Sequence, residues 1–554
     1  MRRLLPMRGA TSAKWVVGAV IVAMAATACS SGDKDAKNDG AKGGTFRLGI
    51  TEPTAIDPFN SQESEGALIT HNLFTGLYSA TVDGKLKPEL AESVQTSDDG
   101  KTWTFKIKQG TKFSNGEPVD AESFVRGWTR VVAKDSASDV AYPFAGINGY
   151  KELNGGSATT FAGVTAPDAG TLKVELSEAD FEFDKKTVHQ AFSPVPKAAG
   201  AASNKAYNDA PIGNGPFKME GSWQHNKSIT LVRNDDYGLE KAKLAKVEIS
   251  ILNAANGSTL EYQGFQSGQF DWARMPTPQQ PVAKAKFSPK KQWIEADTSG
   301  VNYLVAFNQV APLNNPDARK AISYAIDREA IAKGVFQGMQ KPATSVLPPS
   351  FADTYQDGVC SSCVKQDKEK AKQFAEKGGL KPGTVLDFGY NTGAGHEEWV
   401  QAVAQQLKDV LGLEVKLNGK PFKEALAQQQ DKGTGGLWRS AWGADYPTPD
   451  NFLYPLLDSG SINEDPATGK AAGDNRGRYN NPKFDELITK ARGTKDPAAR
   501  AAVYKEAEKL AIDDEQGLIP LWKRTQFRLA ATDKFNNVQL DFFEDPNLAE
   551  ISAK

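Results

Sequence analysis

Several stretches of the chain alternate apolar and polar residues, which is the pattern of a strand with one buried face. The clearest is KTWTFKIK at 101–108, which follows directly on the turn residues Asp98, Asp99 and Gly100. The apolar positions of three such stretches are Trp103, Phe105 and Ile107; Leu172, Val174 and Leu176; and Val247, Ile249 and Ile251. We therefore expect half-buried strands that lie far apart in the sequence.

Helical stretches begin at residues that cap a helix N-terminus and continue with apolar residues three or four positions apart. The predicted caps and the buried positions after them are Asp120 with Phe124, Trp128 and Val131; Asp317 with Ala321, Ile322, Ala325 and Ile326; Asn481-Pro482 with Phe484, Leu487, Ile488 and Ala491; and Asp496-Pro497 with Val503, Ala507 and Leu510. These stripes are typical of a hydrophobic core rather than a cofactor site. Because strands and helices alternate without a fixed period, the sequence predicts a mixed α/β fold and no repeat architecture.

The N-terminus has the features of an export signal. Four cations precede an apolar run at 15–26, which is shorter than the roughly 20 residues that span a bilayer, so residues 1–28 are predicted to be a signal peptide. The small residues that lead into Cys29 resemble a lipobox, in which the cysteine is diacylated and becomes the first mature residue. Ordinary cleavage near Ala28, with Cys29 incidental, is the alternative. Residues 29–44 have almost no apolar side chain, which predicts a flexible tether to a lipid anchor.

The composition fits a secreted globular body. The 554 residues, 39% of them hydrophobic, can bury a large core, and a chain of this length is predicted to form two or three lobes. The formal net charge is -2 and becomes about -6 when the four cations of the predicted signal peptide are removed. Because a duplex-binding protein needs a concentrated basic face, nucleic acid is not an expected partner.

The sequence offers no recognisable catalytic, metal or cofactor motif. Cys360 and Cys363, in GVCSSCV, most simply form a small-loop disulfide, since a redox-active pair lacks the expected strand-to-helix context. Two thiols alone make a poor zinc site. His396 begins HEEWV, but Val400 stands where a zinc protease needs its second histidine. Neither a nucleophile elbow nor a complete phosphate-binding loop occurs, so we expect neither an enzyme nor a bound cofactor.

The stretch WRSAWGADYPTPDNF, residues 438–452, places one cation, Arg439, and one anion, Asp445, among aromatic side chains. A carboxylate in a partly desolvated aromatic setting is costly unless a cation meets it, and the ammonium of a ligand is such a cation. The stretch therefore predicts a site for a zwitterion. The alternative is a buried ion pair between Arg439 and Asp445 that only fixes the turn. Residues 437–442 are predicted to form a short strand, which the prolines that follow bring to an end.

A series of longer motifs extends over nearly the whole predicted mature chain. They are AIDPFNSQ (55–62), LFTGLYSATVDGKLKPELAES (73–93), DGKTWTFKIKQGTKFSNGEPVDAESFVRGWTR (99–130), SPVPK (193–197), PIGNGPFKME (211–220), PLNNPDARKAISYAIDREAI (312–331), WGADYPTPDNFL (442–453) and YNNPKFDELI (479–488). In this order they resemble family 5 of the extracellular solute-binding proteins, the peptide- and nickel-type ABC transporter lipoproteins, and especially the oligopeptide-binding ones.

The resemblance implies a three-lobed α/β fold of the periplasmic-binding-protein type, class II. Lobe I would be discontinuous and comprise residues 45–74, 213–300 and 526–554. A smaller inserted lobe would span residues 75–212, and lobe III would span residues 301–525. Two strands near 300 and 525 would form a hinge, and a ligand that touches both large lobes would close them.

The resemblance also assigns residues to a peptide site. The aspartate of the family's ADY motif, which holds the ammonium of an extended peptide, is Asp445 here, and Arg439 matches an arginine that can meet a ligand carboxylate. The backbones of two segments would pair with the peptide, and water-filled pockets would tolerate many side chains. The further residues placed at the site are Gln62, Glu63 and Ser64 on one side, Ala441, Trp442 and Gly443 on the other, and Phe422 and Tyr142 along the cavity.

The expected function is that of a lipid-anchored monomer on the extracellular face of the cell membrane, or in the periplasm of a Gram-negative cell. It would deliver oligopeptides to the permease and ATPase subunits of an ABC importer; the alanine- and glycine-rich composition suits a Gram-positive bacterium. Relatives in the family also bind nickel chelates, haem, opines or oligosaccharides, and a peptide receptor for signalling would share the same site. A secreted hydrolase would need a nucleophile and a base that the sequence does not offer.

Overall fold

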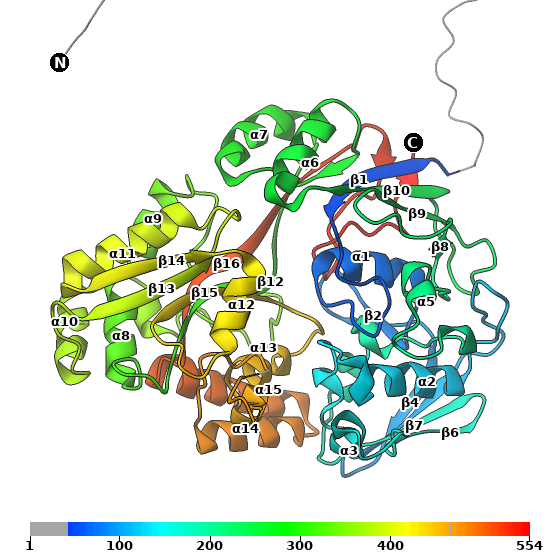
Figure 1. Ribbon diagram of the computed structural model, residues 1–554, viewed down its shortest axis with the longest axis horizontal. Coiled ribbons are helices and arrows are strands. Elements are labelled where there is room, and N and C mark those ends of the chain that lie inside the picture. The colour runs from blue at the N-terminus through cyan, green and yellow to red at the C-terminus, as the bar shows by residue number, and fades with distance from the viewer. Residues whose placement is uncertain (1–42, 466, 472) are drawn as a thin grey trace, which may run out of the picture. The chain divides into compact units, whose positions relative to one another are not determined.

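The computed structural model describes residues 43–465, 467–471 and 473–554 of the chain (Figure 1). The predicted signal peptide, Cys29 and nearly all of the predicted tether lie outside these residues. In the described part of the chain, no helix combines the length and the apolar character that crossing a bilayer requires. Strands and helices are mixed along the chain, as the sequence predicts.

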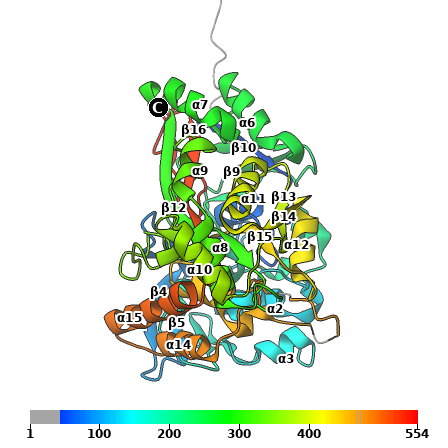
Figure 2. The same ribbon diagram turned by 90° about the vertical axis from the view of Figure 1, so that its left-hand side faces the viewer.

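Within the described residues, ten strands form one large mixed sheet. Two long strands, β12 and β16, pair antiparallel at its centre and run side by side in both views (Figures 1 and 2). In sheet order the strands are β14 (Glu414–Lys420), β13 (Val385–Asn391), β15 (Leu437–Gly443), β12 (Trp293–Ala306), β16 (Leu518–Ala530), β11 (Trp272–Ala273), β1 (Thr45–Thr51), β10 (Lys246–Leu252), β9 (Ser228–Arg233) and β8 (Phe217–Met219).

β12 and β16 connect one half of the sheet to the other. Their pairing shifts register between Asp297 and Val301, and such an irregularity bends a strand pair. Thr298 lies inside the shift, where its hydroxyl donates to the Arg524 carbonyl at 2.9 Å. The shift lies where the sequence analysis expects a hinge, near residues 300 and 525, and its role as a hinge stays a prediction.

The half of the sheet from β11 to β8 packs on a core that gathers three distant segments. This core draws on residues between 46 and 74, between 195 and 287, and between 527 and 551, because the parallel pairing of β1 with β10 brings the first two together. The helices and small strands of this half are α1 (Ser64–Leu73), α6 (Gly257–Gln266), α7 (Gln280–Phe287), β17 (Phe535–Asn536) and β18 (Ser552–Ala553).

The half of the sheet from β14 to β12 has a core on each face. Successive side chains of a strand point to opposite faces, so Leu304 lies in one core while its neighbours Tyr303 and Val305 lie in the other. Leu437 and Trp438 of β15 divide between the two cores in the same way. The helices of this half are α8 (Pro316–Ala325), α9 (Arg328–Gly334), α10 (Lys368–Lys377), α11 (Glu397–Leu411), α12 (Phe422–Gln430), α13 (Asp450–Leu457), α14 (Pro482–Arg492) and α15 (Pro497–Glu508).

One predicted helix start is wrong by two residues. α8 is capped by Asn315, whose side-chain oxygen accepts from the Asp317 N–H at 2.9 Å, so Asp317 lies in the first turn and is not the cap. The reason is Pro316, which has no N–H to donate and a backbone angle already suited to the first helical position. The other predicted caps, Asp120, Asn481 and Asp496, cap their helices as expected.

A separate four-stranded sheet and its helices form the segment from residue 77 to about 210. The helix α2 packs on this sheet, and the Trp128 and Phe105 side chains are buried between them. Asp120 accepts from the Ser123 N–H at 2.9 Å, and Ser123 Oγ accepts in return from the Asp120 N–H at 3.1 Å, which is a capping box. The elements are β2 (Tyr78–Ala80), β3 (Leu86–Pro88), β4 (Ala91–Thr96), β5 (Thr102–Ile107), α2 (Ala121–Val132), α3 (Tyr150–Gly155), β6 (Val164–Asp168), β7 (Thr171–Glu175), α4 (Phe183–Lys186) and α5 (Lys205–Asp209).

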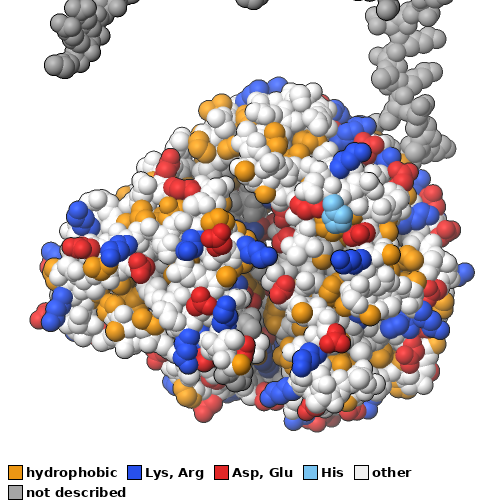
Figure 3. All heavy atoms as spheres, in the orientation of Figure 1, with side chains coloured by type: hydrophobic (Ala, Val, Ile, Leu, Met, Phe, Trp, Pro, Cys, Tyr) orange, Lys and Arg blue, Asp and Glu red, His pale blue; other side chains and the backbone are white. Residues whose placement is uncertain are grey.

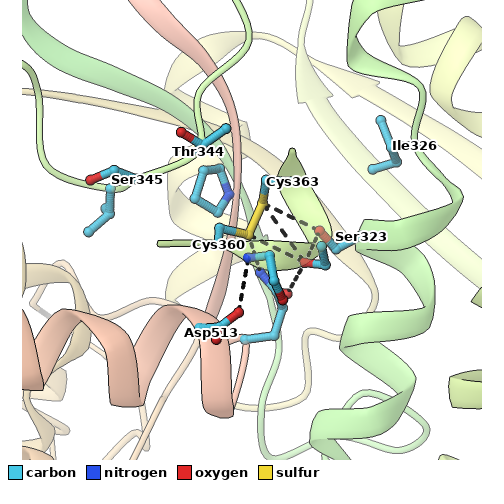
Figure 4. Close-up of a disulfide and its surroundings, with 12 residues drawn as sticks. Ser323, Ile326, Thr344, Ser345, Cys360, Cys363 and Asp513 are labelled. Carbon is cyan, nitrogen blue, oxygen red and sulfur yellow. Dashed lines mark hydrogen bonds between the residues drawn. A yellow bond between two sulfur atoms is a disulfide. The ribbon is translucent and has the colours of Figure 1, made fainter. Parts of the chain in front are cut away.

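Cys360 and Cys363 form a disulfide that lies beside α8 (Figure 4). Both half-cystines are buried, with exposures of 0% and 1%. The Cys360 N–H donates to the Thr344 carbonyl at 2.8 Å, and the Ser361 N–H donates to Asp513 Oδ1 at 2.9 Å. Because the sulfurs are enclosed, the bridge fixes this turn against α8 and presents no thiol at the surface.

Candidate functional site

The strand β15 leaves part of one edge open. On one side it pairs with β12 along its whole length, from Gly443 opposite Gly300 to Leu437 opposite Ala306. On the other side, β13 reaches only Leu437 and Trp438, and no other described strand continues the pairing. The backbone from Arg439 to Gly443 therefore offers N–H and C=O groups to which an extended chain can add as a further strand.

The turn after β15 is held by its own side chains. The Asp445 N–H donates to Asn451 Oδ1 at 2.7 Å, so the first turn of α13 fixes the backbone of the loop. Tyr446 is almost fully buried, and Pro447 and Pro449 restrict the chain between Asp445 and the helix. The Asp445 carboxylate is thereby held at the end of the open edge of β15.

The Asp445 carboxylate accepts hydrogen bonds from two neutral groups. The Tyr142 hydroxyl donates to Oδ2, and Asn451 Nδ2 lies 3.5 Å from the same oxygen and 3.1 Å from the Tyr142 oxygen. No Lys, Arg or His of the described residues forms an ion pair with it. Burial raises the pKa of Asp445, although the bonds from Tyr142 and Asn451 and the charge of Arg524, which forms no ion pair with it, oppose the rise. Asp445 is thus a desolvated carboxylate that has donors but no counter-ion.

A second carboxylate, Asp474, lies close to the first. Burial and the negative charge of Asp445 both raise the pKa of Asp474, while its ion pair with Arg476 at 2.7 Å opposes the rise. Arg476 Nε is buried without a hydrogen-bond partner among the described residues. The region around Asp445 is therefore electronegative, and a cation that enters it is attracted by both carboxylates.

Arg439 is the cation of the site, and it forms no ion pair with Asp445. Its Nη1 donates to Asn391 Oδ1 at 3.1 Å, and no carboxylate of the described residues pairs with it. Burial and the nearby charge of Arg524 lower the pKa of Arg439 to about 10, so it stays charged at neutral pH. Its charge in turn helps burial to lower the pKa of His396 to about 3. The structure does not support the alternative in which Arg439 and Asp445 merely neutralise each other.

The cation and the anion lie towards opposite ends of the open edge. Arg439 is near the start of β15, and Asp445 follows its last residue, Gly443. At about 3.3 Å per residue, the strand advances roughly 13 Å from Arg439 to Gly443. The site thus combines a carboxylate, an open strand edge and a guanidinium in the order that an extended zwitterion requires.

The segment Gln62–Ser64 lies at the N-terminal end of α1, which begins at Ser64. Glu63 is the N-cap residue in an extended conformation, and its Oε1 accepts from the Thr54 N–H at 2.7 Å. The Ser61 carbonyl accepts from Gln190 Nε2 at 2.6 Å, which anchors the segment to the inserted region. Gln62 is exposed, and its backbone makes no hydrogen bond within the described chain, so it is available for pairing.

Two predicted aromatic residues have different surroundings. Trp442 is part-buried on β15, and its indole N–H is buried without a partner among the described residues, so a ligand carbonyl would satisfy it. Phe422 begins α12 with 57% of its surface exposed, and no contact joins it to Asp445 or Arg439. The structure thus brings Tyr142 to the site, keeps Trp442 beside it and leaves Phe422 on the surface.

Three neighbours of the charged pair were missed by sequence reasoning. Asn451 lies in the same motif as Asp445, and its asparagine next to a helix start was an available signal. Asn391 is the last residue of β13 and His396 follows the strand, and only the pairing of β13 with β15 brings them near Arg439, so no local pattern reveals them. The arrangement binds and orients charges but holds no activated nucleophile.

Comparison with known proteins identifies the family. The model of the bacterial extracellular solute-binding proteins, family 5, middle region, matches residues 85–464. The oligopeptide-binding protein OppA of Bacillus subtilis is 32% identical over 516 residues, which cover 89% of this chain and 91% of that protein. The periplasmic oligopeptide-binding protein OppA of Salmonella typhimurium is 30% identical over 499 residues, which cover 86% and 87% of the two chains.

Solved structures agree with this result. The murein tripeptide binding protein MppA of Escherichia coli superposes with a TM-score of 0.77 at 26% identity and covers 93% of this chain and 99% of its own. Its unliganded open form gives a TM-score of 0.72 at 26% identity and covers 93% and 98%. The fold is therefore that of the peptide-type class II binding proteins. The chain belongs to family 5 of the bacterial extracellular solute-binding proteins, and it is a binding protein rather than an enzyme.

Proposed function

We propose that the protein captures oligopeptides outside the cell and delivers them to an ABC importer. The observation that carries this proposal is the Asp445 carboxylate, which accepts hydrogen bonds from neutral groups and forms no ion pair with a described residue, while the charge of Arg524 acts on it only from beyond ion-pair distance. A buried carboxylate of this kind is completed by a cationic ligand group, and the α-ammonium of a peptide is the group that also carries an extended backbone. The names of the relatives as oligopeptide-binding proteins support the same ligand class.

In the proposed complex the peptide lies along the open edge of β15. Its ammonium meets Asp445, its backbone pairs with Ala441–Gly443 and, from the other side, with Gln62–Ser64, and its terminal carboxylate meets Arg439. The roughly 13 Å of strand between Gly443 and Arg439 correspond to an extended peptide of about four residues. Backbone pairing gives affinity without reading side chains, so many sequences would be accepted.

We also propose the architecture and location that the family resemblance implies. Lobe I (45–74, 213–300 and 526–554) and lobe III (301–525) would close on the ligand by bending at the register shift of β12 and β16. The smaller lobe, 75–212, would contact both large lobes: Gln190 ties it to lobe I through the Ser61 carbonyl, and Lys186 ties it to lobe III through Asp450. Cys29 would carry the lipid that holds the protein at the outer face of the membrane, near the permease and ATPase subunits.

The direct test is a cycle of two changes measured by titration calorimetry. Asp445→Asn keeps the shape of the side chain but removes its negative charge, and N-acetylation removes the positive charge of the N-terminus of a tetrapeptide. Each change alone should weaken binding by about 2–4 kcal/mol, because it leaves the opposite charge buried and unpaired. The two losses should not add, since both remove the same interaction.

The fold serves as the control in this experiment. Asp445→Asn should unfold at the same temperature as the unchanged protein or higher, because the variant no longer buries an unpaired charge. Acetylated and free peptides that bind equally well would assign the site to a non-peptide solute. A loss of affinity that is additive in the cycle would place the ammonium elsewhere.

A further inference from the structure

A cavity of about 140 Å³ lies beside the hinge strands, and the proposed peptide path does not use it. Its walls come from β1, the start of α1, the residue after β11, β16 and the loop 543–546. At about 30 Å³ per water molecule, it has room for roughly four or five waters. The charged residues of its walls are Arg274, Arg524, Arg528, Glu65, Glu261, Glu544 and Asp545.

The cavity touches both backbone segments that are proposed to hold the peptide. Ser64, the last residue of the segment Gln62–Ser64, is part of its wall. Arg524, on the opposite wall, lies so close to β15 that a Cβ atom on Gly443 would come within 3.0 Å of its Nη1. A peptide held between these segments therefore passes the cavity and can direct a side chain into it.

The three arginines of the cavity differ in their partners. Arg274 forms ion pairs with Glu261 at 2.7 Å and with Glu65 at 3.3 Å, and Arg524 pairs through Nη2 with Glu544 at 2.8 Å. Arg528 forms no ion pair with any described residue. Only its Nη1 is engaged, with Gln526 Oε1 at 2.6 Å and the Phe527 carbonyl at 3.0 Å.

The guanidinium of Arg528 therefore keeps Nε and Nη2 free to donate, and a part-buried guanidinium with free donors is stabilised by an anion. Burial and the charge of Arg274 lower the pKa of Arg528 to about 10, against the opposing charges of Glu544, Glu261 and Asp545, so the group is still a cation at neutral pH. A basic side chain in the cavity would be repelled by it, and an apolar one would leave its donors without partners.

Asp545, across the cavity, complements an anion as well. Its Oδ2 is buried without a partner among the described residues. Burial and the charge of Asp541 raise the pKa of Asp545, while the charge of Arg528 opposes the rise. In its protonated form the Asp545 carboxyl can donate a hydrogen bond into the same space as the Arg528 guanidinium.

We propose that this cavity is a subsite for a carboxylate of the bound peptide, with Arg528 as its counter-ion. The inference rests on the proposed function, because it takes the peptide path as given. The carboxylate is supplied by an aspartyl or glutamyl side chain or by the terminus of a peptide that bends into the cavity. A side chain is the better match, since Arg439 already lies at the far end of the path.

The test is a positional scan by titration calorimetry with the full protein. Tetra-alanine is compared with peptides that carry Glu, and then Gln, at each position in turn, each with a free and with an amidated C-terminus. Glu should bind about 10-fold or more tightly than Gln at one position, the scale of a charged hydrogen bond. The preference should vanish in Arg528→Met and return in part in Arg528→Lys, while tetra-alanine binds all three proteins equally.

Each other result of the peptide scan leads to a different conclusion. Arg47→Met, at an exposed arginine paired with Glu248, serves as the matched control and should keep the preference for Glu. If Arg528→Met abolishes the effect of C-terminal amidation on affinity but not the preference for Glu over Gln, the carboxylate that enters the cavity is the C-terminus of the peptide. Equal binding of Glu and Gln at every position, or tighter binding of Lys, overturns the subsite while tetra-alanine binding upholds the proposed function. If tetra-alanine fails to bind the unchanged protein, the proposed function itself fails.

Discussion

Asp445 and Asp450 lie five positions apart, the first part-buried and the second almost fully buried, yet their electrostatics are opposite. Asp450 accepts from Arg492 Nε at 2.7 Å and Nη2 at 3.0 Å and lies 3.3 Å from Lys186 Nζ. These cations lower the pKa of Asp450 to about 2 against the effect of burial. Asp445 has only neutral donors, and its pKa is raised. The same type of side chain therefore completes a structural ion pair in one case and lacks an ion-pair partner among the described residues in the other.

The network around Asp450 also joins two regions of the chain that are distant in sequence. Lys186 pairs with Asp180 at 2.6 Å as well as with Asp450. Glu182 accepts from Lys185 at 2.7 Å, from the Thr448 hydroxyl at 2.8 Å and from the Tyr504 hydroxyl at 3.0 Å. Every charge in this network has a partner of opposite sign, so it stabilises one arrangement of the inserted region against α13, α14 and α15 and has no unpaired charge to offer a ligand.

The largest expected effect is on stability and comes from Asp450→Asn. The change leaves Arg492 and Lys186 without their shared anion in a buried setting, which typically costs about 3–5 kcal/mol. The free energy of unfolding, measured by urea denaturation followed by circular dichroism, should fall by about that amount. Affinity of the protein that remains folded should change little.

A matched control is Asp98→Asn, which removes one partner of the surface pair with Lys495 at 2.9 Å. Asp98 is fully exposed, so its loss should leave the free energy of unfolding almost unchanged, as expected for a surface pair that solvent screens. If the free energy of unfolding fell equally in Asp450→Asn and Asp98→Asn, the buried network would contribute no more than an exposed pair. Asp450 could then not be described as a structural counterpart of Asp445.

Arg439→Met should have the opposite effect to Asp450→Asn. The affinity for the peptide should fall, and the stability of the fold should not. In the ligand-free protein Arg439 is a desolvated cation without a carboxylate, so methionine of similar length removes an unfavourable burial. Binding of a tetrapeptide with a free C-terminus should weaken by about 1.5–3 kcal/mol, the scale of a hydrogen bond to a charged group. The amidated tetrapeptide should bind the variant and the unchanged protein alike in calorimetry. A drop in the unfolding temperature without a change in affinity would make Arg439 structural.

The contrast between these regions also marks what the sequence can predict. Local patterns gave the strand over 437–442, the helix caps other than Asn315 and the pairing of charge with aromatic residues around Asp445, because each depends on neighbours in the chain. Tyr142 was reached only through the family resemblance, since it lies 303 positions from its partner Asp445. The hydrogen bond from Thr448 to Glu182 spans 266 positions and left no local signal at all.

The surroundings of two residues, His396 and Arg528, could not be predicted from the sequence for the same physical reason. His396 was interpreted only as a failed zinc motif, yet the pairing of β13 with β15 brings it within the field of Arg439. Arg528 looks like any other arginine on a strand of alternating pattern, and only the folded chain shows that it forms no ion pair with a described residue, although the charges of Glu544, Glu261 and Asp545 act on it. The sequence shows which charged residues are present, but which of them lack an ion-pair partner depends on tertiary packing.

The smallest predicted effect is a pH dependence that separates the two aspartates. The folded-state pKa of Asp445 is raised above its ordinary 3.8, so this group favours the ligand-free fold at low pH, and that contribution is lost as the pH rises through the raised value. Asp450 has the opposite sign: with a pKa of about 2 it contributes stability above pH 3.8, which is lost as the pH falls towards 2. Between these ranges the protein should stay folded while Asp445 takes up a proton and releases the peptide ammonium.

Tetrapeptide affinity should therefore fall as the pH is lowered from 7 into the range in which Asp445 takes up its proton, with no change in the circular dichroism spectrum. Asp445→Asn should bind weakly and almost independently of pH across the same interval, although Asp474, whose pKa is also raised, can leave a small residual slope. If the unchanged protein and Asp445→Asn showed the same slope, the titrating group would be Asp474 or another acid. The cation-free carboxylate at Asp445 would then not be the one that meets the ligand.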